Sequence, residues 1–241
     1  MTDIIIFGSI IVLIAGFFQG LTGFGFSIIA VPFFLKIISL QEIVPILVIL
    51  SICTNFLIFF DCFRKLQITK IWILVLFGVL FVPFGSYSLL YLNPDYLKLF
   101  FGIIVIIFAT LLFLNKSFPI KNEKIGFGVA GALGGFLNGC LSISGPPVVL
   151  FLANQGIEKD SFRANITFYF IVLNIIAIMT YLQNGLLNTV VFEKVLYFIP
   201  AMFLGGFVGI KISKKLNEKL FRKIALLLLI LSGVWTIAGT F

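Results

Sequence analysis

Long stretches of apolar residues, separated by short polar and basic segments, follow one another along the chain. An apolar stretch of about 18 or more residues with few charges is long enough to cross the hydrocarbon core of a bilayer as a helix. The pattern predicts six such helices, at 43–60, 71–91, 96–114, 164–182, 190–210 and 223–239. Two further apolar segments, 4–38 and 125–153, are longer, and glycine and proline interrupt both of them.

The composition excludes a soluble globular domain. Hydrophobic residues make up 61% of the chain and charged residues 11%, whereas soluble domains are roughly 45–50% apolar. Histidine, the commonest metal ligand and the side chain best suited to proton relay near neutral pH, does not occur. The three cysteines lie at unrelated spacings, so neither a disulfide framework nor a metal cluster is predicted. We expect an all-α integral membrane protein without a cofactor.

The two halves of the chain resemble each other at an offset of 119 residues. GFFQG at 16–20 aligns with GFLNG at 135–139, and Asn55 aligns with Asn174. Near the ends of the halves, a small gap changes the offset to 124. Related halves are common in membrane transporters, so this similarity predicts an internal repeat.

The distribution of basic residues favours re-entrant hairpins for the two broken segments. If both were ordinary crossings, the 17 Lys and Arg residues would divide 10 to 7 between the two sides. If 4–38 and 125–153 each dip into the bilayer and return, 14 lie on one side and three on the other, namely Lys36, Lys98 and Lys194. The positive-inside rule then places the 14 in the cytoplasm and both termini outside. Arms of about 15 residues, such as 4–18 and 25–38, would reach the midplane without crossing.

Each half then contains three crossings, an odd number, so the second half is inserted upside down relative to the first. We predict two inverted repeats, each a broken re-entrant helical hairpin followed by three transmembrane helices. The first occupies 1–114 with its hairpin at 4–38, a cytoplasmic linker occupies 115–124, and the second occupies 125–241 with its hairpin at 125–153. Broken helices that meet at the midplane of inverted repeats are typical of alternating-access transporters. The breaks therefore predict a substrate site.

The candidate substrate-binding residues are the small and polar residues at the two breaks, with one aligned asparagine from each half. They are Gln19, Gly20, Thr22, Gly23, Gly25 and Ser27 at the first break, Asn138, Gly139, Ser142, Ser144, Gly145 and Pro146 at the second, and Asn55 and Asn174. Glycine lets the backbone approach a ligand, and proline suits the first turn of a helix. The two returning half-helices would point their N-termini, with unsatisfied N–H groups and partial positive charge, at the bilayer centre. Such a site favours a small oxyanion.

Four other features have alternative interpretations or predict an absence. The centres of the apolar segments hold almost no charged residues, so neither a buried arginine clamp nor a carboxylate cage for a cation is predicted. Asn55 and Asn174 either face the ligand or form hydrogen bonds between helices. Cys140 is interpreted as a small buried thiol, because Leu21 occupies the aligned position. Arg163 either gates anions at the cytoplasmic mouth or only fixes the topology.

Four stretches carry a family resemblance that spans nearly the whole chain. They are Gly20-Leu21-Thr22-Gly23-Phe24-Gly25 with Pro32, Gly139-Cys140-Leu141-Ser142-Ile143-Ser144-Gly145-Pro146-Pro147, Phe162-Arg163-Ala164, and Gly205-x-x-x-Gly209. These stretches resemble the sulfite exporter TauE/SafE family of membrane transporters. The resemblance implies movement of sulfur-containing anions such as sulfite, thiosulfate or organosulfonates, often as export.

We therefore predict a secondary transporter of a small sulfur oxyanion or sulfonate in the cytoplasmic membrane, and not an enzyme. One alternative is a passive anion channel; another is an intramembrane scaffold or enzyme, which the lack of histidines and catalytic carboxylates disfavours. The expected partners are the anion, membrane lipid and protons as the candidate coupling ion, without nucleic acid, and the chain is a monomer or a homodimer. Proton coupling would depend on the boundary acids Glu42, Glu158 and Asp160 or on the protonation of the substrate.

Overall fold

A computed structural model describes residues 2–35, 37–93 and 122–217, with isolated positions between 96 and 103 and between 220 and 227. Nearly all of these residues are helical, and no strand occurs among them. The helices are α1 (Thr2–Thr22), α2 (Phe26–Phe34), α3 (Leu40–Cys62), α4 (Ile68–Tyr91), α6 (Glu123–Leu141), α7 (Gly145–Asn154), α8 (Lys159–Gln183) and α9 (Thr189–Lys215), with the short 3-10 helix η1 (Phe63–Lys65) before α4. The predicted all-α class is confirmed.

Six helices in the described part of the chain are long and apolar enough to cross a membrane, namely α1, α3, α4, α6, α8 and α9. Four of them, α3, α4, α8 and α9, correspond to predicted crossings, and each is a few residues longer than predicted. Local caps set such ends; at the start of α9, the Asn188 side chain accepts a hydrogen bond from the Val191 N–H. The predicted crossings 96–114 and 223–239 and most of the linker 115–124 lie outside the described residues.

Both broken segments turn back, but their arms are unequal. The first break, at 23–25, separates the 21 residues of α1 from the 9 of α2. The second break, at 142–144, separates the 19 residues of α6 from the 10 of α7. The prediction of arms of about 15 residues is therefore wrong. α1 continues past Gly16 and Gly20, which lie in its close contact with α9 rather than at the break.

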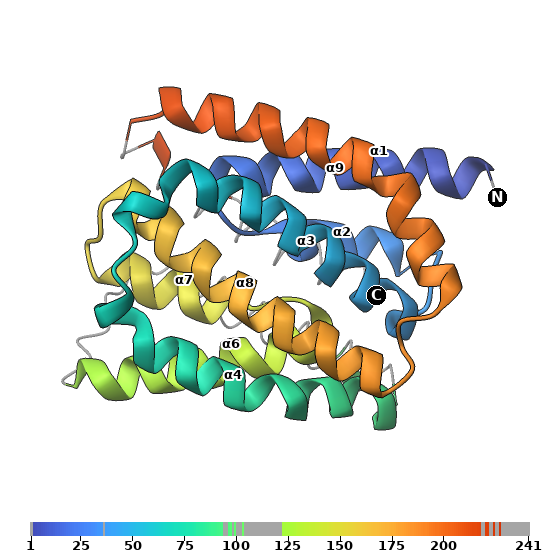
Figure 1. Cartoon of the computed structure of the whole chain (residues 1–241), viewed down its shortest axis with the longest axis horizontal. Coiled ribbons are helices and arrows are strands. Elements are labelled where there is room, and N and C mark those ends of the chain that lie inside the picture. Colours follow the sequence, from blue (N-terminus) through green and yellow to red (C-terminus); the bar gives the residue numbers. More distant parts are fainter. Residues whose placement is uncertain are drawn as a thin grey trace.

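The helices form layers that are seen edge-on in Figure 1. α1 and α9 run side by side along one edge of the molecule, and α4 and α6 run side by side along the opposite edge. α3 and α8 cross between these two pairs, together with the short helices α2 and α7. The first hairpin (α1 and α2) thus packs on a helix of the second half, and the second hairpin (α6 and α7) packs on a helix of the first half.

Glycines allow the two outer helix pairs to approach closely, and they do so at aligned positions. The pairs are Gly16 with Met202 and Gly20 with Gly206 between α1 and α9, and Gly135 with Gly78 and Gly139 with Val82 between α6 and α4. A Cβ atom at any of these four hairpin glycines would lie 3.0 Å or less from a backbone carbonyl oxygen. The hairpin glycines are related by an offset of 119 and their partners by an offset of 124. The same helix contact therefore occurs in both halves.

The two hairpins begin at opposite ends of the molecule. α3 and α9 run in the same direction, because Glu42 pairs with Lys194 at their starts and Asp61 pairs with Lys214 at their ends. The glycine contacts advance together along α1 and α9, so these two helices are also parallel. The chain thus returns, after α2, to the end where α1 began. α6 runs parallel to α4, which starts where α3 ends, so the second hairpin begins and returns at that other end.

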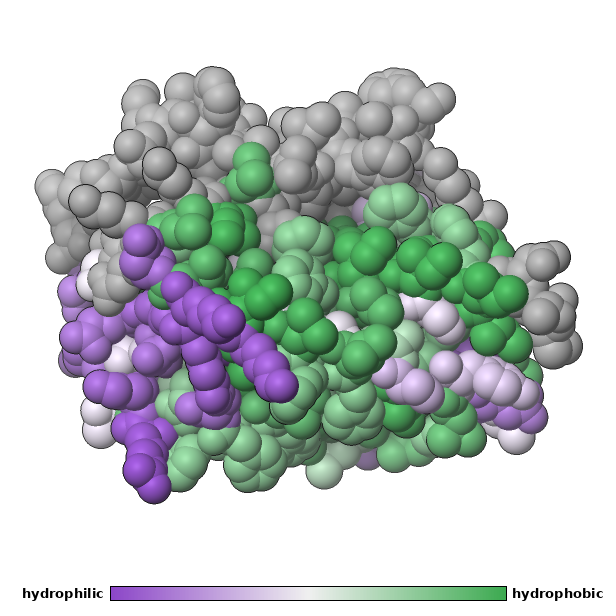
Figure 2. Space-filling model, turned by 90° about the horizontal axis from the view of Figure 1, so that it is seen from above, coloured by the Kyte–Doolittle hydropathy of each residue, from purple (hydrophilic) through white to green (hydrophobic). Residues whose placement is uncertain are grey.

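Polar and apolar residues are separated along the helix axes, from one end of the molecule to the other. Hydrophilic side chains gather at one end of the view in Figure 2, and an apolar band covers the middle. Of the ten Lys and Arg residues that the structure describes, nine lie where α3 and α9 end and α4, α6 and α8 begin, and Lys194 lies at the opposite end. Large apolar side chains are also exposed on the long helices, such as Trp72, Leu80 and Phe84 on α4 and Leu196 on α9. An exposed apolar band between polar ends is the surface of a protein that crosses a bilayer.

Candidate functional site

The two breaks meet around one small cavity between the halves. Its lining consists of Gln19, Gly25, Phe26, Ser27, Ile28, Ser51, Asn138, Ser142, Ile143, Ser144, Gly145, Phe170 and Asn174. Ser51 and Phe170 lie near the middles of α3 and α8, so the cavity lies about halfway along the helices. Its volume is ≈ 20 Å³, enough for about one water molecule.

Eight of the fourteen candidate residues from the sequence line this cavity, namely Gln19, Gly25, Ser27, Asn138, Ser142, Ser144, Gly145 and Asn174. Six do not, namely Gly20, Thr22, Gly23, Asn55, Gly139 and Pro146. Sequence reasoning missed five lining residues, namely Phe26, Ile28, Ser51, Ile143 and Phe170. Ser51 and Phe170 could have been found, because they lie four residues before the two aligned asparagines and hence on the same faces of their helices.

Two buried pairs of amides hold the breaks in the same way. The Gln19 Nε2 donates to the Asn55 Oδ1 over 2.8 Å, and the Asn138 Nδ2 donates to the Asn174 Oδ1 over 3.1 Å. Both donors and both acceptors are aligned at the offset of 119. Hydrogen bonding between elements, one of the two interpretations of the asparagines, is thus observed for both, and Asn174 also lines the cavity.

Two atoms of these amides are buried without a hydrogen-bond partner. They are the Gln19 Oε1 and the Asn174 Nδ2, and both residues line the cavity. Their side chains are almost completely inaccessible, with exposed fractions of 1% and 2%. A buried polar atom without a partner costs about 1–3 kcal/mol. A ligand in the cavity that hydrogen-bonds to them would remove that cost.

Serine hydroxyls join the two breaks across the cavity. The Ser27 Oγ lies 2.9 Å from the Ser142 Oγ, a hydrogen bond between residues 115 positions apart. The Ser144 hydroxyl donates to the Asn138 Oδ1 over 3.2 Å. The first break and the second break are thus bonded directly to each other in this conformation.

Both returning helices point their N-termini at the cavity, but they offer different numbers of N–H donors. α2 begins directly after Gly25, whose φ of 99° is in the left-handed region, and its first three N–H groups have no acceptor within the helix. α7 begins with Gly145-Pro146-Pro147, so only one of its first three residues has an N–H. The predicted proline in the first turn is confirmed. α2 is therefore the richer donor of the two.

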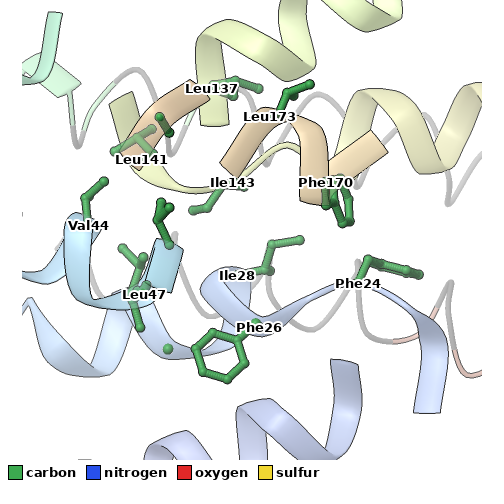
Figure 3. Close-up of a cluster of buried hydrophobic side chains, with 14 of the residues drawn as sticks. Phe24, Phe26, Ile28, Val44, Leu47, Leu137, Leu141, Ile143, Phe170 and Leu173 are labelled. Atoms are coloured by element: carbon green, nitrogen blue, oxygen red, sulfur yellow. The ribbon is translucent and has the colours of Figure 1, made fainter. Parts of the chain in front are cut away.

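Apolar side chains complete the lining. Phe26 and Ile28 come from the first half, and Ile143 and Phe170 come from the second. Figure 3 shows Ile28 on one side of the space between the two hairpins, with Ile143 and Phe170 opposite it. These side chains keep the surroundings of the cavity dry, which strengthens the electrostatic effect of the helix ends.

The last turns of α1 and α6 are also held at aligned carbonyls, away from the cavity. The Arg163 Nη2 donates to the Gly20 carbonyl over 3.1 Å. The Tyr181 hydroxyl donates to the Gly139 carbonyl over 2.6 Å. The two candidate glycines therefore serve helix contacts and these hydrogen bonds in the structure, while their neighbours Gln19 and Asn138 reach the cavity.

Arg163 is buried near the start of α8, outside the cavity lining, so it is not a clamp for a ligand there. Its side chain is 1% exposed and lies 3.5 Å from the Asp61 carboxylate, which also pairs with Lys214. The predicted crossing began after Arg163, but α8 begins at Lys159, so the arginine lies inside the helix. Burial is sustained because Asp61 compensates the charge and a backbone carbonyl accepts a hydrogen bond.

The remaining candidates lie behind the cavity. The Thr22 hydroxyl bonds to backbone carbonyls of the first break, and Gly23 adopts a φ of 88°. Cys140 is fully buried in the core and does not line the cavity. Among the described residues, no group of three or more His, Cys, Asp or Glu side chains could hold a metal ion.

A comparison with protein-family models gives one match. The model described as Sulfite exporter TauE/SafE covers residues 9–236, nearly the whole chain. A comparison with curated proteins finds no match, and neither does a comparison with solved structures.

Proposed function

The chain belongs to the sulfite exporter TauE/SafE family, and from this membership we propose that it is a secondary transporter of small sulfur-containing anions, such as sulfite, thiosulfate or organosulfonates. Family membership and the six apolar helices make it a multi-pass membrane protein of a transporter family. The substrate and its binding site are our proposal, and the argument for the site comes from the cavity.

One observation carries the proposal: the N-termini of α2 and α7 converge on a single neutral, buried cavity. Each helix N-terminus has the effect of roughly half a positive charge, and its unpaired N–H groups bind anions. The unpartnered Asn174 Nδ2 adds a further donor. The candidate binding residues are therefore those eight that line the cavity, with Asn55 supporting Gln19 from behind.

We further propose that the anion is carried by alternating access between inverted repeats, with repeats at 1–114 and 125–241 and a linker at 115–124. The aligned glycine contacts, the aligned amide pairs and the opposite starting ends of the hairpins support this arrangement. The cavity of ≈ 20 Å³ is too small for a sulfur oxyanion. Substrate binding would thus require the two breaks to separate at the hydrogen bond between Ser27 and Ser142.

The charge distribution supports one orientation in the cytoplasmic membrane. The end that carries nine of the ten described basic residues would face the cytoplasm, and both termini would then lie outside. A reporter fused after Phe241 should be active only outside, and one inserted near Lys215 only inside. A cytoplasmic reporter at the C-terminus would contradict this orientation and the inverted repeat.

Flux measurements in proteoliposomes test the function. Of radiolabelled sulfite, thiosulfate and a taurine-like sulfonate, at least one should show saturable uptake by the full-length protein, with and without a pH gradient. Flux that does not saturate and needs no coupled ion would identify an anion channel instead. Liposomes that transport none of these anions would contradict the proposal.

Protons are the proposed coupling ion, and the boundary acids are one route for them. The structure adds Asp61 to the predicted set of Glu42, Glu158 and Asp160, because Asp61 pairs with the buried Arg163. Neutralising all four should abolish the effect of a pH gradient if a protein carboxylate carries the proton. If the effect survives, the proton travels with the substrate.

A further inference from the structure

The cavity between the two breaks has no formal charge in its lining. Its polar side chains are those of Gln19, Asn138, Asn174 and serines, and none of the residues that line it is titratable except at extreme pH. Arg163, the nearest buried cation described above, is engaged by Asp61 and by a backbone carbonyl and is not part of the lining. The positive potential inside the cavity therefore comes from oriented dipoles.

The size of that potential limits the charge that it can balance. The N-terminus of α2 acts as roughly half an elementary charge and that of α7, where prolines leave one N–H among the first three residues, as no more than that, so together they match at most about one negative charge. The helices have 9 and 10 residues, and the effect arises in their first turns, so both contribute. A second negative charge on the ligand would be buried without compensation, which costs several kcal/mol.

The two unpartnered atoms of the lining also favour one orientation of a singly charged ligand in the cavity. The Asn174 Nδ2 is a donor and would bind an anionic oxygen, whereas the Gln19 Oε1 is an acceptor and would repel one. Phe26, Ile28 and Phe170 add apolar surface. The lining is thus suited to a ligand with oxyanion oxygens on one face and a hydroxyl or apolar group on the other.

Resting on the proposed transport function, we infer that this cavity selects its substrate by charge state. It accepts sulfur oxyanions with a single negative charge, such as hydrogensulfite and short alkanesulfonates. It rejects the dianions sulfite, sulfate and thiosulfate, although their size and oxygen atoms are similar. Sulfite would then cross the membrane as hydrogensulfite, so each transported anion would bring its own proton, and a pH gradient would act without a titratable group in the cavity.

Competition between sulfur anions in proteoliposomes distinguishes selection by the charge of the anion from selection by its shape. The full-length protein takes up radiolabelled methanesulfonate, a monoanion at all working pH values, in two buffers one pH unit below and one above the midpoint between hydrogensulfite and sulfite. Unlabelled methanesulfonate should inhibit equally in both buffers. The half-inhibitory concentration of total sulfite should rise about tenfold in the alkaline buffer, because the hydrogensulfite fraction falls about tenfold. Sulfate should not inhibit in either buffer.

The outcomes of this competition experiment distinguish a failure of the charge-state inference from a failure of the proposed transport function. Equal inhibition by sulfate and methanesulfonate, or a sulfite potency that does not change between the buffers, would overturn the charge-state inference while leaving the transporter proposal intact. Uptake of sulfate or thiosulfate without any uptake of methanesulfonate would also overturn it. If no sulfur anion is taken up, the proposed function itself fails, and this inference with it.

A charge introduced into the lining provides a second test. Ser51→Lys would place a cation beside Gln19, with which Ser51 shares a hydrogen bond. This variant should bind sulfate, so that sulfate now inhibits methanesulfonate uptake. The matched control is Ser88→Lys on α4, which lies outside the lining and should keep the wild-type competition profile. A folded Ser51→Lys protein that still excludes sulfate would contradict the inference, and the wild-type profile decides the question even if this variant does not fold.

Discussion

The two hairpins share an amide pair at the cavity but differ in the donor that holds the backbone carbonyl one residue later. In each, an amide at the end of the long arm, Gln19 or Asn138, donates to an aligned asparagine. One residue later, the Gly20 carbonyl accepts a hydrogen bond from a charged guanidinium, whereas the Gly139 carbonyl accepts one from a neutral tyrosine hydroxyl. The aligned carbonyls of the two hairpins are thus held by donors of different charge, although the amide pairs beside them are alike.

The difference lies in what each hairpin is attached to. Asp61 compensates the buried charge of Arg163, and it also binds Lys214 in the last turn of α9. The first break is therefore tied to the charged end of the protein through an ion network. The Tyr181 hydroxyl is neutral and needs no compensating charge. Among the described residues, the second break is therefore held by neutral hydrogen bonds. We expect the first hairpin to respond to changes in charge and the second to respond only to loss of packing or hydrogen bonds.

The largest difference between the hairpins is expected in the free energy of unfolding when Arg163 or Tyr181, the donors to the Gly20 and Gly139 carbonyls, is replaced. Arg163→Ala leaves Asp61 with only its exposed partner Lys214 and should lower the free energy of unfolding by about 3 kcal/mol. Tyr181→Phe removes one hydroxyl and should lower it by about 1–2 kcal/mol. Denaturant unfolding of the purified protein in detergent measures both, with Arg163→Lys as the variant that keeps the charge. Equal losses for the two donors would show that charge does not distinguish the hairpins.

Alanine at the N-terminal glycines of the returning helices should separate backbone strain from contact. Gly25 has a φ of 99° and open space around a Cβ position, so Gly25→Ala should cost about 2 kcal/mol of stability through strain alone. At Gly145, a Cβ would lie 3.2 Å from the end of the flexible Ile28 side chain, so Gly145→Ala should change stability by about 0.5 kcal/mol or less.

Valine at either glycine should reduce substrate affinity, because both residues line the cavity. Unfolding and radioligand binding on the same preparations distinguish the two effects. A Gly25→Ala protein as stable as the wild type would contradict the expected backbone strain at Gly25. A valine variant with unchanged affinity would contradict the placement of that glycine at the substrate site.

Loss of the amides should affect the two hairpins equally. Gln19→Ala and Asn138→Ala should each weaken anion binding by about 1–2 kcal/mol, or roughly tenfold in Kd, because each removes a polar group of the lining and frees its partner asparagine. Isothermal titration or competition uptake measures the change. Asn55→Ala, which acts through its hydrogen bonds to Gln19 and Ser51 and does not itself line the cavity, should have the smaller effect. A large loss at one amide and none at the other would mean that only one hairpin meets the ligand.

The smallest effect is expected at Cys140, whose aligned position in the first hairpin is Leu21. Its thiol is buried and lies outside the lining, with only a weak contact of 3.8 Å to the Leu137 carbonyl. Cys140→Ser should therefore leave transport unchanged and alter stability by about 1 kcal/mol or less. Transport that fails in folded Cys140→Ser protein while the glycine variants remain active would require a thiol-centred mechanism instead.

The sequence predicted the elements of this fold whose causes are local. Glycine and proline mark both breaks, and apolar length marks the four described crossings, because helix propensity and bilayer thickness act on short stretches. The unequal arms were not predictable in the same way. α1 runs past Gly16 and Gly20 to Thr22, and these glycines lie in its contact with α9, a distant segment that hydropathy does not reveal.

The parts of the site that the sequence did not reveal depend on contacts between distant segments. Ser51 and Phe170 enter the lining because α3 and α8 cross beside both breaks. Arg163 is buried because Asp61, 102 positions earlier, reaches it from α3. Hydropathy can place an arginine near a membrane boundary. Whether a carboxylate from another helix lies beside it and compensates its charge is determined by the packing of the helices.

The hydrogen bond between Ser27 and Ser142 has a consequence for the speed of a carrier. A sulfonate oxygen that enters between these hydroxyls takes the place of a partner that each already has, so the number of hydrogen bonds hardly changes. An exchange of this kind releases little net free energy, and a loosely held cargo leaves quickly. For a transporter whose cargo is abundant, rapid release is worth more than tight capture. The closed pair of serines would therefore favour throughput over affinity.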